Sequence, residues 1–332
     1  MARIFTEGFE TGDTTFWTTQ WASASVNAGT VRSGVYSYSN DNVGSPSIKN
    51  LPNSYTEFYF RSGVYNGNFT ASYYIFSFRN GSTNGLRLQY DYTTQKLKAI
   101  LDTSTVLATG VINTIQNAWH LIEIYIKVDN AVGRFVVKVD GLIDIDFTGD
   151  TLGAASSINA ISYSGVGSTK FIDDLALNDT SGSVDKSWCG DGKIVKLVPN
   201  ANGSSSQWLG SDGNNTDNYQ LVDEIPPSDS DYVRATGSGY IDEYGLSNVD
   251  FAGQTIQRIW MISRGKSDAS GDYFLHGIKT SGTSYLVTGS LGTSFGRIDI
   301  ETTGTWALNP YTGGAWSQEQ LDNLLLVIKA PG

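Results

Sequence analysis

Cysteine and basic residues are scarce in this chain, and each scarcity excludes a class of function. Cys189 is the only cysteine among 332 residues, so no disulfide can form within the chain and no cysteine-based zinc site exists. Lys and Arg number 22 against 33 Asp and Glu, which gives a net charge of −11. Because phosphate contacts need clustered Lys and Arg, and the sequence has no such cluster, we expect no nucleic-acid partner.

Long apolar runs are also lacking. No segment approaches the ~18 consecutive apolar residues of a membrane-spanning helix, so we expect no membrane insertion. The opening MARIFTEGFE has one Arg and no apolar core, and it does not resemble a secretory signal. This combination fits a protein made in a cytoplasm, a protein cloned without its leader, or one that a host cell makes for a virus particle.

The remaining composition favours short strands joined by polar turns. Gly contributes 37 residues, charged residues only 17% and aromatic residues 12%, which is typical of β proteins with real cores. Alternation of polar and apolar residues predicts strands through the first 180 residues, among them RIFTE, AWHLIEIYIKV, GRFVVKVD and LIDIDFTG. Asp140-Gly141, between the last two, predicts a two-residue hairpin turn.

A polar segment divides the chain into two predicted domains. Residues 1–180 are predicted to form one β-sandwich, 181–192 a linker, and 193–332 a second, jelly-roll-like β-sandwich. The predicted fold is all-β, with two tandem antiparallel β-sandwich (jelly-roll) domains.

One short helix is expected near the C-terminus of the second domain. Ser317 followed by Gln320 is a capping-box pattern, and it predicts a helix at about 317–324. The apolar run LLVIKA that follows predicts a final strand that returns to the sheet.

Two predicted strands carry alternating carboxylates, which glycoside hydrolases use as acid and base. They are LIDIDFTG, with Asp144 and Asp146, and RIDIETTG, with Asp299 and Glu301. Both resemble the E-x-D-x-x-E-type strand of sandwich-fold β-glucanases. The position of the first glutamate is, however, Leu142 in one and Arg297 in the other. We therefore interpret these acids as solvent-facing, and we expect no enzyme.

The histidines give no nucleophilic triad. There are only two, His120 and His276, and no G-x-S-x-G elbow precedes a helix. His120 lies on the more apolar side of AWHLIEIYIKV, so we expect it at the margin of a buried face.

The loop SDGNNTDNYQLVDE offers weak calcium ligands. They are Asp212, Asn214 and Asp217, although such residues more often form Asx turns. We expect no cofactor other than a structural calcium ion.

Loop aromatics are the carbohydrate-binding candidates. Trp208, Trp306 and Tyr311 lie in loop-like stretches, where they could stack on sugar rings, anchor the loops or form a subunit interface. Trp119 and Trp260 lie within strand patterns and are predicted to be core.

The stretch KFIDDLALND places two adjacent carboxylates, Asp173 and Asp174, in a predicted strand. Consecutive strand residues point to opposite faces, so these two are not expected to converge on one atom, and one of them should be buried. We interpret the stretch as the closing strand of the first sandwich, paired near IFTEGFE.

Four stretches carry a family resemblance. In order, IFTEGFE, NAWHLIEIYIKV, FVVKVDGLIDIDFTG and KFIDDLALND resemble the concanavalin A-like, laminin-G-like sandwich family. The variant that opens with E-G-F-E and closes with I-D-D is similar to domains of tailed-bacteriophage virion proteins. The second half, ending GGAWSQEQLDNLLLVIKA, resembles a C-terminal jelly-roll-like module of phage minor tail and other structural proteins.

The resemblance implies a non-enzymatic virion protein on the tail or decorating the capsid. Its expected partners are other virion proteins, its own copies in a homo-oligomer such as a trimer, and a host-surface glycan. The main alternative is a carbohydrate-binding, lectin-like adhesion module. A third hypothesis is a glycoside hydrolase or lyase, which requires carboxylates from distant strands to converge in a groove.

Overall fold

The computed structural model describes residues 3–40, 45–68, 70–164, 170–251, 253–269, 271–299 and 305–332. Strands make up 49% of the structure and helix 3%, which confirms the predicted all-β class. The chain divides into two compact units, Met1–Val195 and Lys196–Gly332. Within the described ranges, no helix has the length and apolar character needed to cross a membrane.

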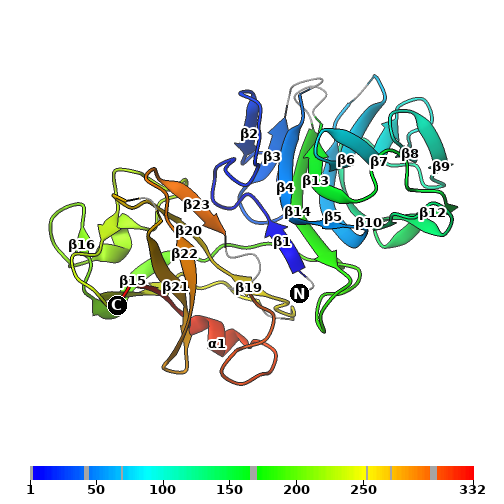
Figure 1. Ribbon diagram of the computed structural model, residues 1–332. Coiled ribbons are helices and arrows are strands. Elements are labelled where there is room, and N and C mark those ends of the chain that lie inside the picture. The colour runs from blue at the N-terminus through cyan, green and yellow to red at the C-terminus, as the bar shows by residue number, and fades with distance from the viewer. Residues whose placement is uncertain are drawn as a thin grey trace. The chain divides into compact units, whose positions relative to one another are not determined.

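Two antiparallel sheets build the first unit (Figure 1). Its strands are β1 (Arg3–Glu7), β2 (Ala24–Asn27), β3 (Ser37–Asn40), β4 (Ser47–Tyr55), β5 (Glu57–Asn66), β6 (Tyr73–Asn80), β7 (Thr83–Asp91), β8 (Lys96–Leu101), β9 (Thr105–Thr109), β10 (Ala118–Lys127), β11 (Gly133–Val139), β12 (Leu142–Gly149), β13 (Ile158–Tyr163) and β14 (Lys170–Asp179). The first sheet has the order β12-β11-β10-β5-β14-β3-β2, with β1 also pairing with β14. The second has the order β4-β13-β6-β7-β8-β9.

The core of this unit lies between the two sheets. Phe60 of β5 packs against Phe76 and Phe78 of β6, with ring centroids 4.9 and 5.7 Å apart. Ile122 and Ile124 of β10 are also buried in this core. Each fully buried side chain of this size stabilises the fold by roughly 1.5–3 kcal/mol. Strand alternation then places the intervening residues of β5 and β10 on the opposite side of the first sheet, here called the outer face.

Two local predictions for the first unit are confirmed. Asp140 and Gly141 have φ angles of 51° and 83°, as a type I′ hairpin turn between β11 and β12 requires. The closing strand β14 pairs with the first strand, β1, with Glu7 opposite Leu175.

The second unit contains one five-stranded sheet and three two-stranded pairs in its described residues. Its elements are β15 (Pro199–Ser206), β16 (Leu209–Gly210), η1 (Asn218–Leu221), β17 (Val233–Arg234), β18 (Ile241–Leu246), β19 (Ile259–Trp260), β20 (Ile262–Gly265), β21 (Tyr273–Thr280), β22 (Thr283–Ser290), β23 (Gly296–Asp299), β24 (Thr305–Trp306), α1 (Gln318–Asp322) and β25 (Leu325–Lys329). The large sheet has the order β15-β18-β25-β21-β22.

The predicted helix and final strand are both present. Ser317 caps α1 by accepting a hydrogen bond from the Gln320 backbone N–H, while the Gln320 side chain accepts one from the Ser317 N–H. The helix spans Gln318–Asp322, shorter than the predicted 317–324. The chain then joins the sheet as β25 between β18 and β21.

Candidate functional site

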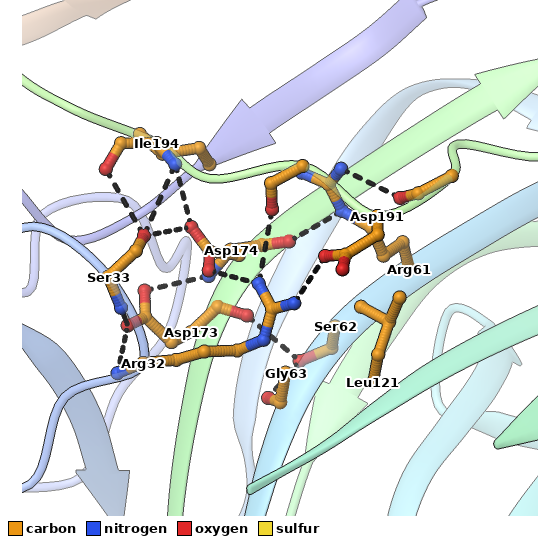
Figure 2. Close-up of polar contacts among 12 residues, drawn as sticks. Arg32, Ser33, Arg61, Ser62, Gly63, Leu121, Asp173, Asp174, Asp191 and Ile194 are labelled. Atoms are coloured by element: carbon orange, nitrogen blue, oxygen red, sulfur yellow. Dashed lines mark hydrogen bonds and ion pairs between the residues drawn. The ribbon is translucent and has the colours of Figure 1, made fainter. Parts of the chain in front are cut away.

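The two adjacent aspartates of β14 are both fully buried, which corrects the expectation that only one would be. Between the pairs Asp173–Gly63 and Ala176–Arg61, two residues of β14 lie opposite one residue of β5, so the strand contains a β-bulge. Asp174 adopts the left-handed conformation, with φ of 53°. The inserted residue breaks the alternation, and both carboxylates face the same loop (Figure 2).

That loop is the segment before β3 that contains Arg32 and Ser33. Asp173 accepts hydrogen bonds from the backbone N–H groups of Arg32 and Ser33, at 3.0 and 3.2 Å. Asp174 accepts from Arg32 Nη1 at 2.5 Å, from Ser33 Oγ at 2.6 Å and from the Ile194 N–H at 2.8 Å. The expectation that the two side chains point to opposite faces is therefore wrong, because it assumed a strand without a bulge. The two carboxylates still bind different atoms, as expected.

Burial and the charges of neighbouring side chains shift the pKa values of Asp173 and Arg32. Burial and the neighbouring charge of Asp174 raise the pKa of Asp173 to about 8, against the opposing effect of three backbone N–H donors. Burial lowers the pKa of Arg32, but the charges of Asp174 and Asp191 outweigh this, and the net pKa is raised. Arg32 is thus held as a cation between two carboxylates.

Residues 180–195, here called the closing segment, lie against the outer face of the first sheet. Glu123 Oε1 accepts a hydrogen bond from the Gly190 N–H at 2.7 Å, and Arg61 Nη1 donates to the Gly190 carbonyl at 3.0 Å. The Trp188 ring lies 5.4 Å from the Tyr59 ring. The segment predicted as a linker, 181–192, is therefore part of the first unit.

A pocket of about 280 Å³ opens where the closing segment meets the outer face. It is lined by Arg32 from the loop before β3, by Trp119, Leu121 and Glu123 from β10, by Asp140 and Gly141 from the β11–β12 turn, and by Asp191 from the closing segment. These residues come from four separate parts of the chain. The closing segment thus contributes Asp191 to the pocket wall.

Trp119 forms the aromatic part of this pocket. It is half-buried on the outer face, where its ring meets the Tyr65 ring edge-on at 5.7 Å, and Tyr65 in turn lies 5.9 Å from Phe171. The expectation that Trp119 is a core residue is therefore wrong. Alternation directs His120 and Ile122 into the core and leaves the tryptophan outside.

The carboxylates of the pocket differ in how fully they are bonded. Asp140 uses both oxygens, one accepting from the Leu121 N–H at 2.8 Å and the other 2.7 Å from His120 Nδ1. Asp191 Oδ1 accepts from Arg32 Nη2 at 2.5 Å. Glu123 is 4% exposed, and apart from the Gly190 N–H at Oε1 no described residue donates to its carboxylate.

The predicted loop aromatics do not form a common surface. Trp208 is buried, and its Nε1 donates to the Tyr240 carbonyl at 3.0 Å. Trp306 is buried in a core cluster of the second unit. Only Tyr311 is exposed, at 55%. Because stacking on a sugar needs an open ring face, the first two are corrected to structural residues.

The predicted calcium ligands form local turns. The Asn214 N–H donates to Asp212 Oδ1 at 3.2 Å, and the Thr216 N–H donates to Asn214 Oδ1 at 2.6 Å, which are the Asx turns named as the alternative. Asp217, with φ of 58°, precedes η1. No group of three or more His, Cys, Asp or Glu is placed to hold a metal ion in the part of the chain that the structure describes.

The carboxylates compared with β-glucanases do not gather at one site. Asp144 is buried and accepts from the Ile112 N–H at 2.6 Å, so it is not the solvent-facing residue expected. Asp146 pairs with Arg134. Asp299 pairs with Arg297 at 2.8 Å, and Glu301 lies outside the described residues.

Both histidines are buried. His120 is 7% exposed, with its Nε2 3.1 Å from the Ile115 carbonyl, which confirms its expected place at the margin of a buried face. In the second unit, the Nδ1 atom of His276 lies 2.7 Å from Ser263 Oγ, and burial lowers the pKa of His276 to about 4.

No protein-family model matches the sequence, and no curated protein matches it. Among solved structures, the chain is similar to endo-β-1,4-glucuronan lyase from Trichoderma reesei, with 13% identity, a TM-score of 0.40, and coverage of 54% of this chain and 96% of that one. It is similar to domain 4 of AbnA, a GH43 extracellular arabinanase from Geobacillus stearothermophilus, with 12% identity, a TM-score of 0.40 and coverage of 54% and 93%. It is also similar to carbohydrate-binding module CBM66 from Bacillus subtilis, with 11% identity, a TM-score of 0.32 and coverage of 47% and 96%.

Proposed function

We propose that the first unit binds a carbohydrate in the pocket between β10, the β11–β12 turn and the closing segment. The observation that carries this proposal is that a half-buried tryptophan, Trp119, and a carboxylate, Glu123, line the same pocket. A sugar ring has an apolar C–H face that packs on an aromatic ring, and hydroxyl groups that donate to carboxylates. At about 280 Å³ the pocket suits one ring of a glycan rather than a long chain segment.

The proposed binding is non-catalytic. Glycoside hydrolysis requires an acid and a second carboxylate facing each other across the bond. Asp140 has both oxygens bonded within the fold, and Asp191 is paired with Arg32. Glu123 and Asp191 each use one oxygen within the fold, and of these two Glu123 is the one without an ion pair to a described residue. Release of reducing ends from a polysaccharide panel would contradict this part of the proposal.

A glycan array followed by calorimetry tests the binding. Replacing Trp119 by alanine removes the aromatic surface, worth about 1–1.5 kcal/mol, and should weaken binding roughly five- to tenfold. The matched control is Tyr311→Ala, an exposed aromatic of the second unit, which should leave the affinity unchanged. An array without a hit would refute the proposal.

We also propose that the chain is a structural component of a tailed-bacteriophage virion, on the tail or decorating the capsid, assembled as a homo-oligomer. The support is the sequence resemblance carried by IFTEGFE, KFIDDLALND and GGAWSQEQLDNLLLVIKA. A virion protein of this kind could also bind a host glycan. Negative-stain microscopy of virions labelled with an antibody to the chain should show decorated particles, and undecorated particles would contradict the assignment.

A further inference from the structure

We propose that the solvent side of the second sheet of the first unit binds the carboxylate groups of an acidic polysaccharide through Arg79 and Arg87. This site is separate from the pocket described above, because no residue that lines the pocket belongs to the second sheet. It lies on the neighbouring strands β6, β7 and β8 (Figure 1). The site is here called the basic face, and it consists of Tyr74, Ser77, Arg79, Arg87, Gln89 and Lys98.

Strand register places the two arginines on the same side of the sheet. Phe76 and Phe78 of β6 are buried in the core, so alternation directs Ser77 and Arg79 to the other side. Ser77 lies opposite Arg87 of β7, which brings the second arginine onto the same face. Both arginines are partly buried.

The second sheet is basic, although the whole chain has a net charge of −11. Its six strands carry five Lys and Arg residues and a single carboxylate, Asp91. Asp91 forms an ion pair with Lys98 and lies opposite Lys96, so its charge is already compensated. In the turn after β8, Asp102 accepts a hydrogen bond from the Ala154 N–H at 2.9 Å.

Both guanidinium groups have N–H groups that the fold leaves unused. Arg87 donates through Nε to Ser77 Oγ at 3.1 Å, and its guanidinium carbon lies 3.1 Å from the centre of the Tyr74 ring. Arg79 donates through Nη2 to the Ser82 carbonyl at 2.9 Å, and its Nε is buried without a hydrogen-bond partner. Among the described residues, no carboxylate forms an ion pair with either arginine.

Two neighbouring cations without a carboxylate between them are electrostatically unfavourable. Burial and the charge of Arg79 lower the pKa of Arg87, against the opposing effect of the Tyr74 phenol. A ligand carboxylate would relieve this repulsion and would accept charge-assisted hydrogen bonds from the unused N–H groups. The basic face therefore has the charge and the donors that an anion requires.

The rest of the basic face favours a glycan over an acidic peptide. The strand order β4-β13-β6-β7-β8-β9 places β6 and β7 in the interior of the sheet. A peptide therefore cannot bind there by pairing its backbone with an exposed strand edge. Tyr74 offers an aromatic ring to sugar C–H groups, and the Gln89 amide can bond to sugar hydroxyls. These contacts match sugar rings that carry carboxylates.

Calorimetry on the full chain at pH ~7 compares three probes of equal length: a galacturonic acid hexamer, its fully methyl-esterified counterpart and a hexaglutamate peptide. The acid hexamer should bind about tenfold or more tightly than the ester, which has the same rings without the charge. Raising the salt concentration should weaken the acid hexamer selectively. No binding of the acid hexamer, equal binding of the ester, or tighter binding of the peptide would each overturn the proposal.

Arg79→Gln tests the named residues, with Arg134→Gln as its charge-matched control. Arg79 donates to one turn carbonyl among the described residues, so the fold of the variant should persist. The affinity for the acid hexamer should fall about tenfold, and Arg87→Gln should have the same effect. Arg134 lies in the first sheet and pairs with Asp146, so its change should keep the affinity. An equal loss in all three variants would show a general charge effect and overturn the proposal.

Trp119→Ala separates the basic face from the pocket. This change should weaken a ligand that binds in the pocket and leave the affinity for the acid hexamer unchanged. If Trp119→Ala abolishes binding of the acid hexamer and Arg79→Gln does not, the acid hexamer occupies the pocket and the proposal for the basic face fails. If the acid hexamer depends on Arg79 and no glycan depends on Trp119, the pocket function fails and the basic face is supported.

Discussion

The ion pair between Arg32 and Asp174 should be among the most stabilising contacts of the first unit. Replacing Arg32 by methionine keeps much of the apolar stem but leaves the Asp174 carboxylate without its counter-charge. Among the described residues, the Ser33 hydroxyl and the Ile194 N–H then remain as its donors. The Arg32 side chain is 13% exposed and that of Asp174 is 0% exposed. Removing one partner of a buried pair costs about 3–5 kcal/mol. Because whole domains are stable by about 5–15 kcal/mol, we expect a large shift of the unfolding midpoint.

Urea denaturation of the full chain, followed by circular dichroism and calorimetry, measures this cost. In a double-mutant cycle, Asp174→Asn should recover part of the loss, because the neutral amide no longer needs a counter-charge. Arg134→Met is the control, since Arg134 pairs with Asp146 at a site where the two side chains are 35% and 51% exposed, and such pairs contribute about 0–1 kcal/mol. If Arg32→Met costs no more than Arg134→Met, or if the cycle shows no coupling, the ion pair does not hold the loop as inferred.

Three further predictions concern other parts of the chain. Burial lowers the pKa of His276 from 6.5 to about 4, so between these pH values the unfolded chain binds a proton that the folded chain does not. The free energy of unfolding should therefore fall by about 3 kcal/mol as the pH drops from about 6.5 to 4. Urea unfolding across this range should show the fall, and His276→Gln should flatten it. The Cys189 thiol is buried, and burial raises its pKa to about 11. Ellman's reagent should therefore label this thiol only after denaturation. Rapid labelling of the folded chain would mean that the closing segment is not docked. Ser317→Ala removes the helix cap and should destabilise the second unit by about 1 kcal/mol, whereas Ser317→Asp should retain stability; equal loss in both would rule out the capping role.

Local sequence codes were sufficient for several elements of the fold. The hairpin turn at Asp140-Gly141 requires positive φ at both positions, and this residue pair is strongly preferred there. The capping box at Ser317 is similarly a contact between residues three apart. Each of these features is determined by side chains within a few positions of one another, so the sequence alone predicts them.

The bulge at Asp174 shows where strand alternation fails. A pattern with a period of two assumes that every residue has a partner on the next strand, and one inserted residue reverses every face beyond it. Leu175 consequently lies in the core, whereas a strand without the bulge would place it on the same side as Asp173. The available signal was the double aspartate itself, because Asp is among the residues that tolerate a positive φ.

The candidate pocket could not be predicted for a different reason. Arg32 and Asp191 are 159 positions apart, yet they form one wall of it. The small polar residues of 181–192 have the composition of a linker. The docking of this segment becomes visible only in the structure, where the Gly190 backbone forms hydrogen bonds with the Arg61 and Glu123 side chains. Such long-range contacts leave no periodic pattern in the sequence.

The docked closing segment determines where the first unit can be separated from the rest of the gene product. A fragment ending at Asp179 would leave the Tyr59 ring without Trp188 above it, and Glu123 without its backbone donor. The uncovered aromatic surface would favour aggregation, and the loss of Asp191 would remove one wall of the pocket. A fragment ending at Val195 keeps these contacts, so domain exchange, fusion to a reporter and display on a heterologous particle should all use that junction.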